Sequence, residues 1–321
     1  MATVETGARL HFGFQNLSLA HERLYGGVGV ALASPQNVIE AEQDSTVSCA
    51  DEAVEPYVRA AVDALDVGGA DVTVHERCRR HVGLGSGTQL SLACLGAIGE
   101  CYGLVPRVRE RAPALGRGGR SGVGVATFEQ GGFVVDAGHP TERFTSEPPP
   151  EGAWTVPSPI AAADVAEDWR FVLVTPDAAA GRSGETEDQS MRSVVERADP
   201  GIGDQIATVL TRRLLPAVVE GDIEEFGSAV ARLGRLNGAW YADEQGGVYR
   251  PPAGQLIETL GASSAVTGAG QSSWGPTVYG ITSADREDAA ATAGREALDE
   301  AGIGGRVRVV GPRNRGATVR Q

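Results

Sequence analysis

The pattern of apolar and polar positions in the first half of the chain alternates between strand and helix periods. It predicts strands over residues 3–12, 26–32, 37–42 and 71–75. Five apolar residues at helical spacing predict a helix over 51–65, namely Val54, Val58, Ala61, Val62 and Leu65. The stretch 88–102 is apolar nearly all round, which predicts a central, buried helix. A short helix is expected to open at Pro106.

Two further strands follow before the pattern changes. They are predicted over 123–129 and 133–136, with a hairpin turn at Gly131 and Gly132. The segment from Pro148 to Pro159 is typical of a linker, so we predict domains at 1–155 and 156–321. The second half predicts strands over 170–174, 277–281 and 306–310, and helices over 204–219, 223–238, 255–260 and 284–301. This order favours a smaller α+β domain packed on the first.

Composition narrows the classes of function. The 321 residues carry a net charge of −14, and all 28 basic residues are Arg. The absence of Lys excludes Schiff-base and lysine-nucleophile mechanisms, so Arg, His, backbone amides or a metal must hold an anionic substrate. The negative charge argues against a nucleic-acid partner. The acidic, lysine-free composition indicates either a salt-rich cytoplasm or a GC-rich codon bias.

The sequence shows no signal-peptide pattern and no apolar run near the length of a membrane span. We therefore expect a cytoplasmic protein with no membrane partner. The four cysteines include no C-x-x-C pair and the five histidines include no H-x-x-x-H pair. We expect neither a disulfide framework nor a structural zinc.

A glycine-rich loop carries the most specific chemistry. Residues 81–89 read H-V-G-L-G-S-G-T-Q and run straight into the apolar helix. Glycines let a ligand approach bare N–H groups, and the helix start adds unpaired N–H groups and the positive end of its dipole. This pattern is typical of a phosphate cradle, although it lacks the Lys of a Walker A loop and the G-x-G-x-x-G dinucleotide spacing. A tight strand-to-helix turn without a ligand is the alternative.

Six segments match one known family in order and spacing, over nearly the whole chain. They are R-L-H-F at 9–12, G-G-V-G at 26–29, the loop at 81–89, the glycine-rich 116–124, G-G-F-V-V-D-A-G-H at 131–139 and G-Q-S-S-W-G-P at 270–276. On these residues the chain resembles the β-ribofuranosylaminobenzene 5′-phosphate synthases, a branch of the GHMP kinase superfamily. The glycine loop alone implies only the superfamily, whereas the segment at 270–276 is far more specific.

The resemblance implies an α+β, GHMP-kinase-like fold of two domains. The N-terminal α/β domain would hold the phosphate loop, and the C-terminal domain would be ferredoxin-like. The implied reaction transfers phosphoribosyl from phosphoribosyl pyrophosphate to 4-aminobenzoate, releases carbon dioxide and pyrophosphate, and serves the biosynthesis of a methanopterin-type cofactor. The resemblance also implies a requirement for Mg²⁺ and a homodimer. It does not identify the metal ligands.

The implied reaction gives the candidate residues their roles. The glycine loop would stabilise the leaving pyrophosphate through Gly83, Leu84, Gly85, Ser86, Gly87, Thr88 and Gln89. Further contacts to a phosphate or to the acceptor would come from Arg117, Ser121, Gln271, Ser272, Ser273 and Trp274. Trp274 offers a flat face to the aromatic ring. The predicted catalytic residues are Arg9, His11, Arg120 and Asp136, of which Asp136 is also a candidate magnesium ligand.

These roles have plainer alternatives. In the alternative interpretation, Arg117 and Arg120 are solvated charges on a loop. Trp274 would then be a buried side chain that packs between the domains. His11 is otherwise a structural histidine, and Asp136 a turn residue. The main alternative function is an ATP-dependent small-molecule kinase. The glycine-rich segment 116–124 argues against a kinase, because Gly124 stands where such kinases commonly carry Asp. A non-enzymatic phosphosugar sensor is the other alternative.

Overall fold

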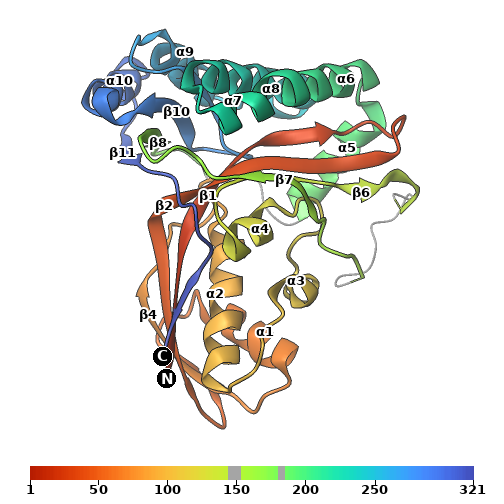
Figure 1. The fold of residues 1–321 in the computed structure, drawn as a ribbon, viewed down its shortest axis with the longest axis vertical. Coiled ribbons are helices and arrows are strands. Elements are labelled where there is room, and N and C mark those ends of the chain that lie inside the picture. Colours follow the sequence, from red (N-terminus) through yellow and green to blue (C-terminus); the bar gives the residue numbers. More distant parts are fainter. Residues whose placement is uncertain (144–152, 180–184) are drawn as a thin grey trace.

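A long antiparallel ribbon of two strands organises the molecule. The computed structural model describes residues 1–143, 153–179 and 185–321. In it β1 (Ala2–Asn16) pairs with β2 (Arg23–Gln43) along nearly its whole length (Figure 1). The two strands predicted over 26–32 and 37–42 are therefore one strand. Polar and turn-forming residues at 34–37 interrupt the apolar pattern, but the pairing with β1 continues past them after a register shift.

The first sheet builds the lower body of the molecule around this ribbon. Its strand order is β12-β1-β2-β4-β3, and β5 pairs with both β2 and β7. The further strands are β3 (Val47–Cys49), β4 (Ala70–Glu76), β5 (Phe133–Asp136), β6 (His139–Pro140), β7 (Pro159–Ala163) and β12 (Thr318–Arg320). The helices of this half are α1 (Glu55–Leu65), α2 (Ser86–Cys101), α3 (Val108–Arg111) and α4 (Val123–Glu129), with short 3₁₀ turns at Ala112–Leu115 and Thr141–Arg143.

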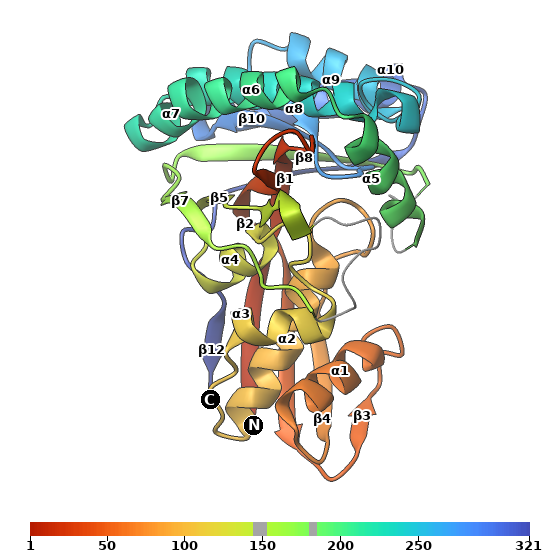
Figure 2. The ribbon, with the colours of Figure 1, turned by 90° about the vertical axis from the view of Figure 1, so that its right-hand side faces the viewer.

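Helix α2 confirms the predicted central helix. It packs against both β1 and β2, and α1 packs beside it (Figure 2). Every residue from Leu90 to Gly99 is buried. A helix that is apolar all round must be covered on all sides, and the sheet, α1 and α4 provide that cover.

Helix α4 is a correction. Residues 123–129 were predicted as a strand of a hairpin, but they form a helix whose Val123, Val125 and Phe128 side chains are all buried. A short apolar run that is buried on every side has no periodicity that separates a helix from a strand. Gly131 and Gly132 do have the positive φ of a turn, at 75° and 67°. They join α4 to β5 rather than two strands of a hairpin.

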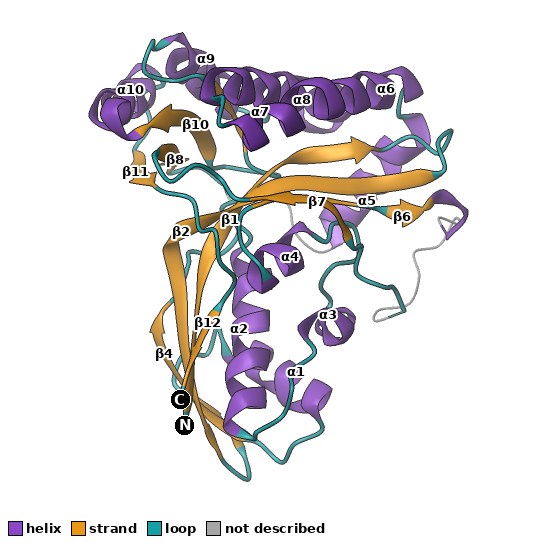
Figure 3. Ribbon diagram, in the orientation of Figure 1, coloured by secondary structure: helices purple, strands orange, loops and turns teal. Residues whose placement is uncertain are grey.

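The second sheet confirms the predicted ferredoxin-like domain. Its order is β11-β8-β10-β9 with antiparallel pairing throughout. The strands are β8 (Trp169–Pro176), β9 (Gly268–Gln271), β10 (Val278–Ser283) and β11 (Gly305–Val310). The helices are α5 (Glu185–Arg197), α6 (Pro200–Val209), a π-helical turn (Leu210–Leu214), α7 (Leu215–Glu220), α8 (Ile223–Gln245), α9 (Ala253–Ala262) and, after a 3₁₀ turn (Ala284–Arg286), α10 (Glu287–Glu300). Figure 3 shows this helical layer above the strands.

The two halves exchange chain segments. Strand β7 lies after residue 155 yet pairs with β5, and β12 at the C-terminal end pairs with β1. The chain termini consequently lie side by side (Figure 1). The boundary at 155/156 stays a prediction, and part of the predicted linker falls outside the described residues. Within the described ranges, no helix is long and apolar enough to cross a membrane.

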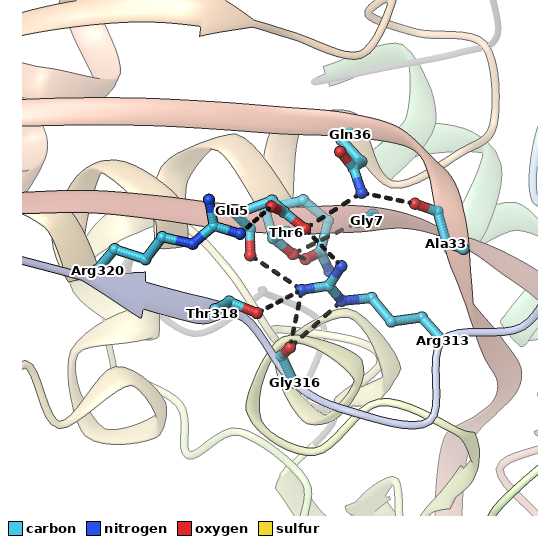
Figure 4. Close-up of polar contacts among 10 residues, drawn as sticks. Glu5, Thr6, Gly7, Ala33, Gln36, Arg313, Gly316, Thr318 and Arg320 are labelled. Carbon is cyan, nitrogen blue, oxygen red and sulfur yellow. Dashed lines mark hydrogen bonds and ion pairs between the residues drawn. The ribbon is translucent and has the colours of Figure 1, made fainter.

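A buried arginine fastens the returning C-terminal segment to β1 (Figure 4). Only 5% of the Arg313 side chain is exposed, and its guanidinium pairs with the Glu5 carboxylate at 3.1 Å. The same guanidinium donates to the Gly316 carbonyl and the Thr318 hydroxyl, both at 3.1 Å. Arg320 reaches the same carboxylate at 3.4 Å, but 70% of its side chain is exposed. One carboxylate therefore has a buried and an exposed partner.

We predict that this difference in burial decides the cost of losing each arginine. Arg313→Gln should lower the free energy of unfolding by about 3 kcal/mol, because it leaves Glu5 poorly compensated in a buried setting. The matched control Arg320→Gln should change it by less than about 0.5 kcal/mol. Urea unfolding of both variants measures the difference. Equal losses would contradict the structural role given to Arg313.

Candidate active site

The glycine loop ends at an uncapped helix start. Gly85 precedes α2 with a φ of 70°, and no side chain caps the helix. The first backbone bond that closes the turn runs from Gln89 N to Gly85 O at 3.1 Å. An α-helix leaves its first N–H groups without partners inside the helix, and its dipole is positive there. The position predicted for a phosphate cradle therefore has the electrostatics of an anion site.

The fully buried Ser272 hydroxyl joins three segments that are far apart in the sequence. It accepts a hydrogen bond from His11 N at 3.1 Å and donates one to Gly83 O at 2.7 Å. Arg9 Nη1 donates to the same Gly83 oxygen at 2.9 Å. The predicted residues Arg9, His11, Gly83 and Ser272 thus lie together. Ser272 has a structural contact here, and its predicted contact with a ligand stays a prediction.

Two backbone bonds reinforce this junction along β1. Arg9 N donates to Leu84 O at 3.1 Å, and Ser273 N donates to His11 O at 3.1 Å. The contact is so close that only glycine fits at Gly83. A Cβ atom there would lie 2.4 Å from Ser272 O, and its φ of 87° disfavours other residues. The loop, β1 and the 270–276 segment therefore form one rigid wall.

His11 stays neutral at physiological pH. Burial and the neighbouring Arg9 charge lower the pKa of its imidazole to about 3. Its ring packs edge-on against Phe14, with centroids 4.9 Å apart, and makes no hydrogen bond to any residue in the described ranges. A neutral imidazole with unused nitrogens can donate or accept a hydrogen bond from a ligand, but it is a weak base.

Asp136 is a fully buried structural hub. Its Oδ2 accepts from Gly27 N at 2.9 Å, Gly122 N at 2.7 Å and Ser121 Oγ at 3.0 Å, and its Oδ1 accepts from Gly138 N at 2.9 Å. Burial raises the pKa of this carboxyl, and the four hydrogen bonds oppose the rise. These contacts place Asp136 and Ser121 together and tie the loops at 121–122 and at Gly138 to β2.

The described residues do not build a magnesium site by themselves. Donors already surround the Asp136 carboxylate, so it is poorly suited to be an open metal ligand. Across the described ranges, no three His, Cys, Asp or Glu side chains gather in a group that could hold a metal ion. A protein-only cage for Mg²⁺ therefore does not fit this site.

Gln89 and Thr88 brace α2 against α4. The buried Gln89 amide accepts from Thr6 Oγ1 at 2.6 Å and donates to Gly124 O at 2.8 Å. A Cβ atom at Gly124 would lie 3.0 Å from the Thr88 methyl group. A side chain at position 124, such as the carboxylate common in related kinases, therefore requires Thr88 to move.

The predicted arginines lie on the segment between the first 3₁₀ turn and α4. Arg117 Nε donates to Ser91 Oγ at 3.3 Å, and its Nη1 is 3.6 Å from the point that a Cβ of Gly87 would occupy. Arg117 therefore flanks the uncapped helix start. Arg120 is half-buried three residues further on.

A pocket with aromatic walls lies next to this junction, at His11. It encloses about 60 Å³. Its principal lining residues are His11, Phe14, Asn237, Tyr241, Ser273 and Trp274. Trp274 packs edge-on against Tyr241, with centroids 4.9 Å apart. The pocket shares His11 and Ser273 with the junction at the glycine loop, so the two features adjoin.

Sequence reasoning missed the α8 side of this pocket. Asn237 accepts from Phe14 N at 2.7 Å and donates to Phe14 O at 3.0 Å, which holds the end of β1 against the helix. Residues 234, 237, 238, 241 and 245 all line the pocket and recur at helical spacing. The predicted helix ended at residue 238, so Tyr241 and Gln245 fell outside it, whereas α8 continues to Gln245.

Two family models match the chain. The GHMP kinases N terminal domain matches residues 50–132, and the GHMP kinases C terminal model matches residues 214–302. Solved structures are similar in fold alone. A mevalonate kinase of Methanococcus jannaschii superposes with a TM-score of 0.66 at 12% identity, over 97% of this chain and 98% of that one. A galactokinase of Lactococcus lactis gives 0.65 at 12%, over 98% and 94%.

Curated relatives match at higher identity over the full length. The beta-ribofuranosylphenol 5′-phosphate synthase of Methanothermobacter thermautotrophicus is 34% identical, over 98% of this chain and 97% of the relative. The protein of the same name from Archaeoglobus fulgidus is 35% identical, over 99% of both. These matches confirm the family that the motifs of the sequence indicated. The chain is an enzyme that belongs to the beta-ribofuranosylphenol 5′-phosphate synthase family of the GHMP kinase superfamily.

Proposed function

We propose that the enzyme transfers the phosphoribosyl group of phosphoribosyl pyrophosphate to a para-substituted benzoate, with loss of carbon dioxide and pyrophosphate. The bond from ribose C1 to the pyrophosphate oxygen breaks, and pyrophosphate leaves with the electron pair. The ring carbon that bears the carboxylate attacks C1 and forms a carbon–carbon bond. Loss of carbon dioxide returns an electron pair to the ring and restores aromaticity. No strong base is needed. The product would enter the biosynthesis of a methanopterin-type cofactor.

One observation carries this proposal: the glycine loop that leads into an uncapped helix start adjoins an aromatic pocket at His11. The N–H groups at the start of α2 would stabilise the charge that develops on pyrophosphate. The pocket at Trp274 would hold the flat acceptor. Because His11 and Ser273 border both features, the two substrates would meet there.

The acceptor has to open the pocket further. A volume of about 60 Å³ equals roughly two water molecules, whereas a cavity that holds benzene measures about 150 Å³. Trp274 and Tyr241 both line the pocket and pack edge-on against each other. We propose that ring binding turns Trp274 aside.

The para substituent is an amino or a hydroxyl group. The sequence resemblance implies 4-aminobenzoate. The name of the relatives contains ribofuranosylphenol, and 4-hydroxybenzoate would give a ribosylated phenol by the same chemistry. Both acids would release carbon dioxide from their carboxylate, so one assay of released carbon dioxide compares the two substrates directly.

We further propose that Arg9, Arg120 and Arg117 grip the anionic parts of the substrates and that His11 contributes a hydrogen bond from its neutral ring. Any magnesium requirement would come from the metal carried by the substrate's phosphates, since magnesium is commonly bound in this way. The assembly inferred from the family is a homodimer, which size-exclusion chromatography with light scattering tests.

The first prediction concerns the overall reaction. Carboxyl-labelled 4-aminobenzoate or 4-hydroxybenzoate, incubated with the enzyme, phosphoribosyl pyrophosphate and magnesium in high salt, should release labelled carbon dioxide. Release should equal pyrophosphate formed and should need both substrates. A parallel incubation with ATP in place of the phosphosugar should give no phosphorylated product. Phosphorylation with ATP, and no labelled gas, would contradict the proposal and favour the kinase.

The second prediction concerns the acceptor wall. Trp274→Ala should raise the KM for the aromatic acid about tenfold, because an aromatic contact is worth roughly 1 kcal/mol beyond the area it buries. The KM for phosphoribosyl pyrophosphate should stay within twofold and serves as the internal control. Equal increases in both KM values would show a general loss of structure instead of a ring contact.

The third prediction concerns the charge of His11. Because its pKa is about 3 in the folded chain and about 6.5 when unfolded, the unfolded state binds more protons between those values. Wild-type stability should therefore fall as pH drops below 6.5, by about 2 kcal/mol at pH 5. His11→Gln should lose correspondingly less. Urea unfolding at pH 7.5 and pH 5 measures this, and identical losses in both proteins would place the His11 pKa near its ordinary value.

A further inference from the structure

The aromatic pocket lies between β1 and α8, which belongs to the helical layer above the strands (Figure 3). Its lining comprises residues 11–14 of β1, one face of α8, part of the segment 271–274, and Val248 and Tyr249 from the loop after α8. His11 is on the strand side and also belongs to the junction with the glycine loop. The Tyr249 hydroxyl is on the helix side, 3.5 Å from the point that a Cβ atom of Gly234 would occupy.

The Tyr249 hydroxyl is buried and has no hydrogen-bond partner among the described residues. Two amide side chains of the same lining are instead fully engaged: Asn237 bonds to the Phe14 backbone, and Gln271 bonds to Arg250 N and Ser273 O. A buried polar group without a partner has lost its hydrogen bonds to water and gained none in return, so it calls for an explanation. A ligand in the pocket supplies one, because it can complete the missing bond.

This hydroxyl keeps its proton at neutral pH. Burial raises the pKa of the Tyr249 phenol, and the charge of Arg235 opposes the rise. A protonated phenol donates one hydrogen bond and accepts others. It can therefore pair with an amino or a hydroxyl group on a ligand, whereas a hydrogen atom on a ring carbon leaves it unpaired.

The proposed chemistry decides which end of the acceptor faces α8. The ring carbon that bears the carboxylate has to meet ribose C1 on the glycine-loop side of the pocket, next to His11. The para substituent is at the opposite end of the ring from this carbon. A ring that spans the pocket from β1 to α8 therefore brings its para group to Tyr249.

We propose that Tyr249 determines the specificity for the acceptor, and that its hydroxyl binds the para amino or hydroxyl group. The inference rests on the proposed function and deepens it. A site built to hydrogen-bond an OH or NH group of its substrate rejects an analogue that lacks the group, because the buried partner is then left unpaired. Tyr249 thus favours para-substituted acids over benzoate. It was not among the residues that the sequence pointed to.

Acids that differ only in the para group test this role. 4-Hydroxybenzoate, 4-aminobenzoate and benzoate are titrated calorimetrically into the wild type and Tyr249→Phe, with magnesium and pyrophosphate present. The wild type should bind the preferred substituted acid about tenfold more tightly than benzoate, the effect of one buried hydrogen bond. Tyr249→Phe should weaken the binding of that acid about tenfold and should not weaken the binding of benzoate.

Tyr279→Phe is the matched control. Tyr279 also has a buried hydroxyl without a hydrogen-bond partner in the described ranges. Its ring packs against Phe12, with centroids 5.3 Å apart, but Tyr279 is not part of the pocket lining. Removal of this hydroxyl should change the binding of each acid by no more than twofold.

The other outcomes separate the inference from the proposed function. Substituted acids that bind the wild type and Tyr249→Phe equally well would overturn the role of Tyr249 and leave the proposed function intact. Equal weakening of all three acids by Tyr249→Phe would make Tyr249 a part of the pocket's shape and overturn its role in specificity. An equal loss of preference in Tyr279→Phe would overturn it as well. A wild-type enzyme that binds none of the acids would overturn the proposed acceptor itself.

Discussion

The buried Ser272 hydroxyl is the constraint on which the site depends. It holds His11 N and Gly83 O at once, and so fixes the strand that carries Arg9 and His11 against the glycine loop. Because Ser272 comes from the ferredoxin-like half, the two halves must be docked before the loop takes its shape. A buried hydroxyl that loses either partner would leave an unsatisfied polar group, which costs about 1–3 kcal/mol.

At this junction, residues that the sequence predicted to contact a ligand also hold the fold together. Asp136, Gln89 and Ser272 looked like ligand contacts in the sequence, yet each is engaged in hydrogen bonds that hold loops and helices together. The groups left for a ligand are different ones: the uncapped N–H groups of α2, the neutral His11 ring and the aromatic pocket wall. The polar residues that surround the site preorganise it, so that little has to rearrange when charge develops on a leaving group.

Local signals predicted the parts of this fold that have local causes. The glycine loop and the apolar α2 were recognised because both are continuous in sequence. The α4 segment was misassigned because a helix of seven residues, five of them buried, is too short to show a clear period, and β2 was split because its polar middle looks like a loop. No local signal links Ser272 to Gly83, or Tyr249 to the pocket at His11, since these contacts exist only after distant segments have packed. The family resemblance supplied the second sheet's fold, which strand propensity alone left undefined.

The central claim is that a pyrophosphate site at the start of α2 and an aromatic site at Trp274 adjoin at His11. A crystal structure of the enzyme with pyrophosphate and 4-hydroxybenzoate bound together tests it most directly. The account predicts pyrophosphate on the N–H groups at the start of α2 and the aromatic ring against Trp274, with His11 between them. Pyrophosphate bound away from α2, or a ring outside the pocket at Trp274, would contradict it.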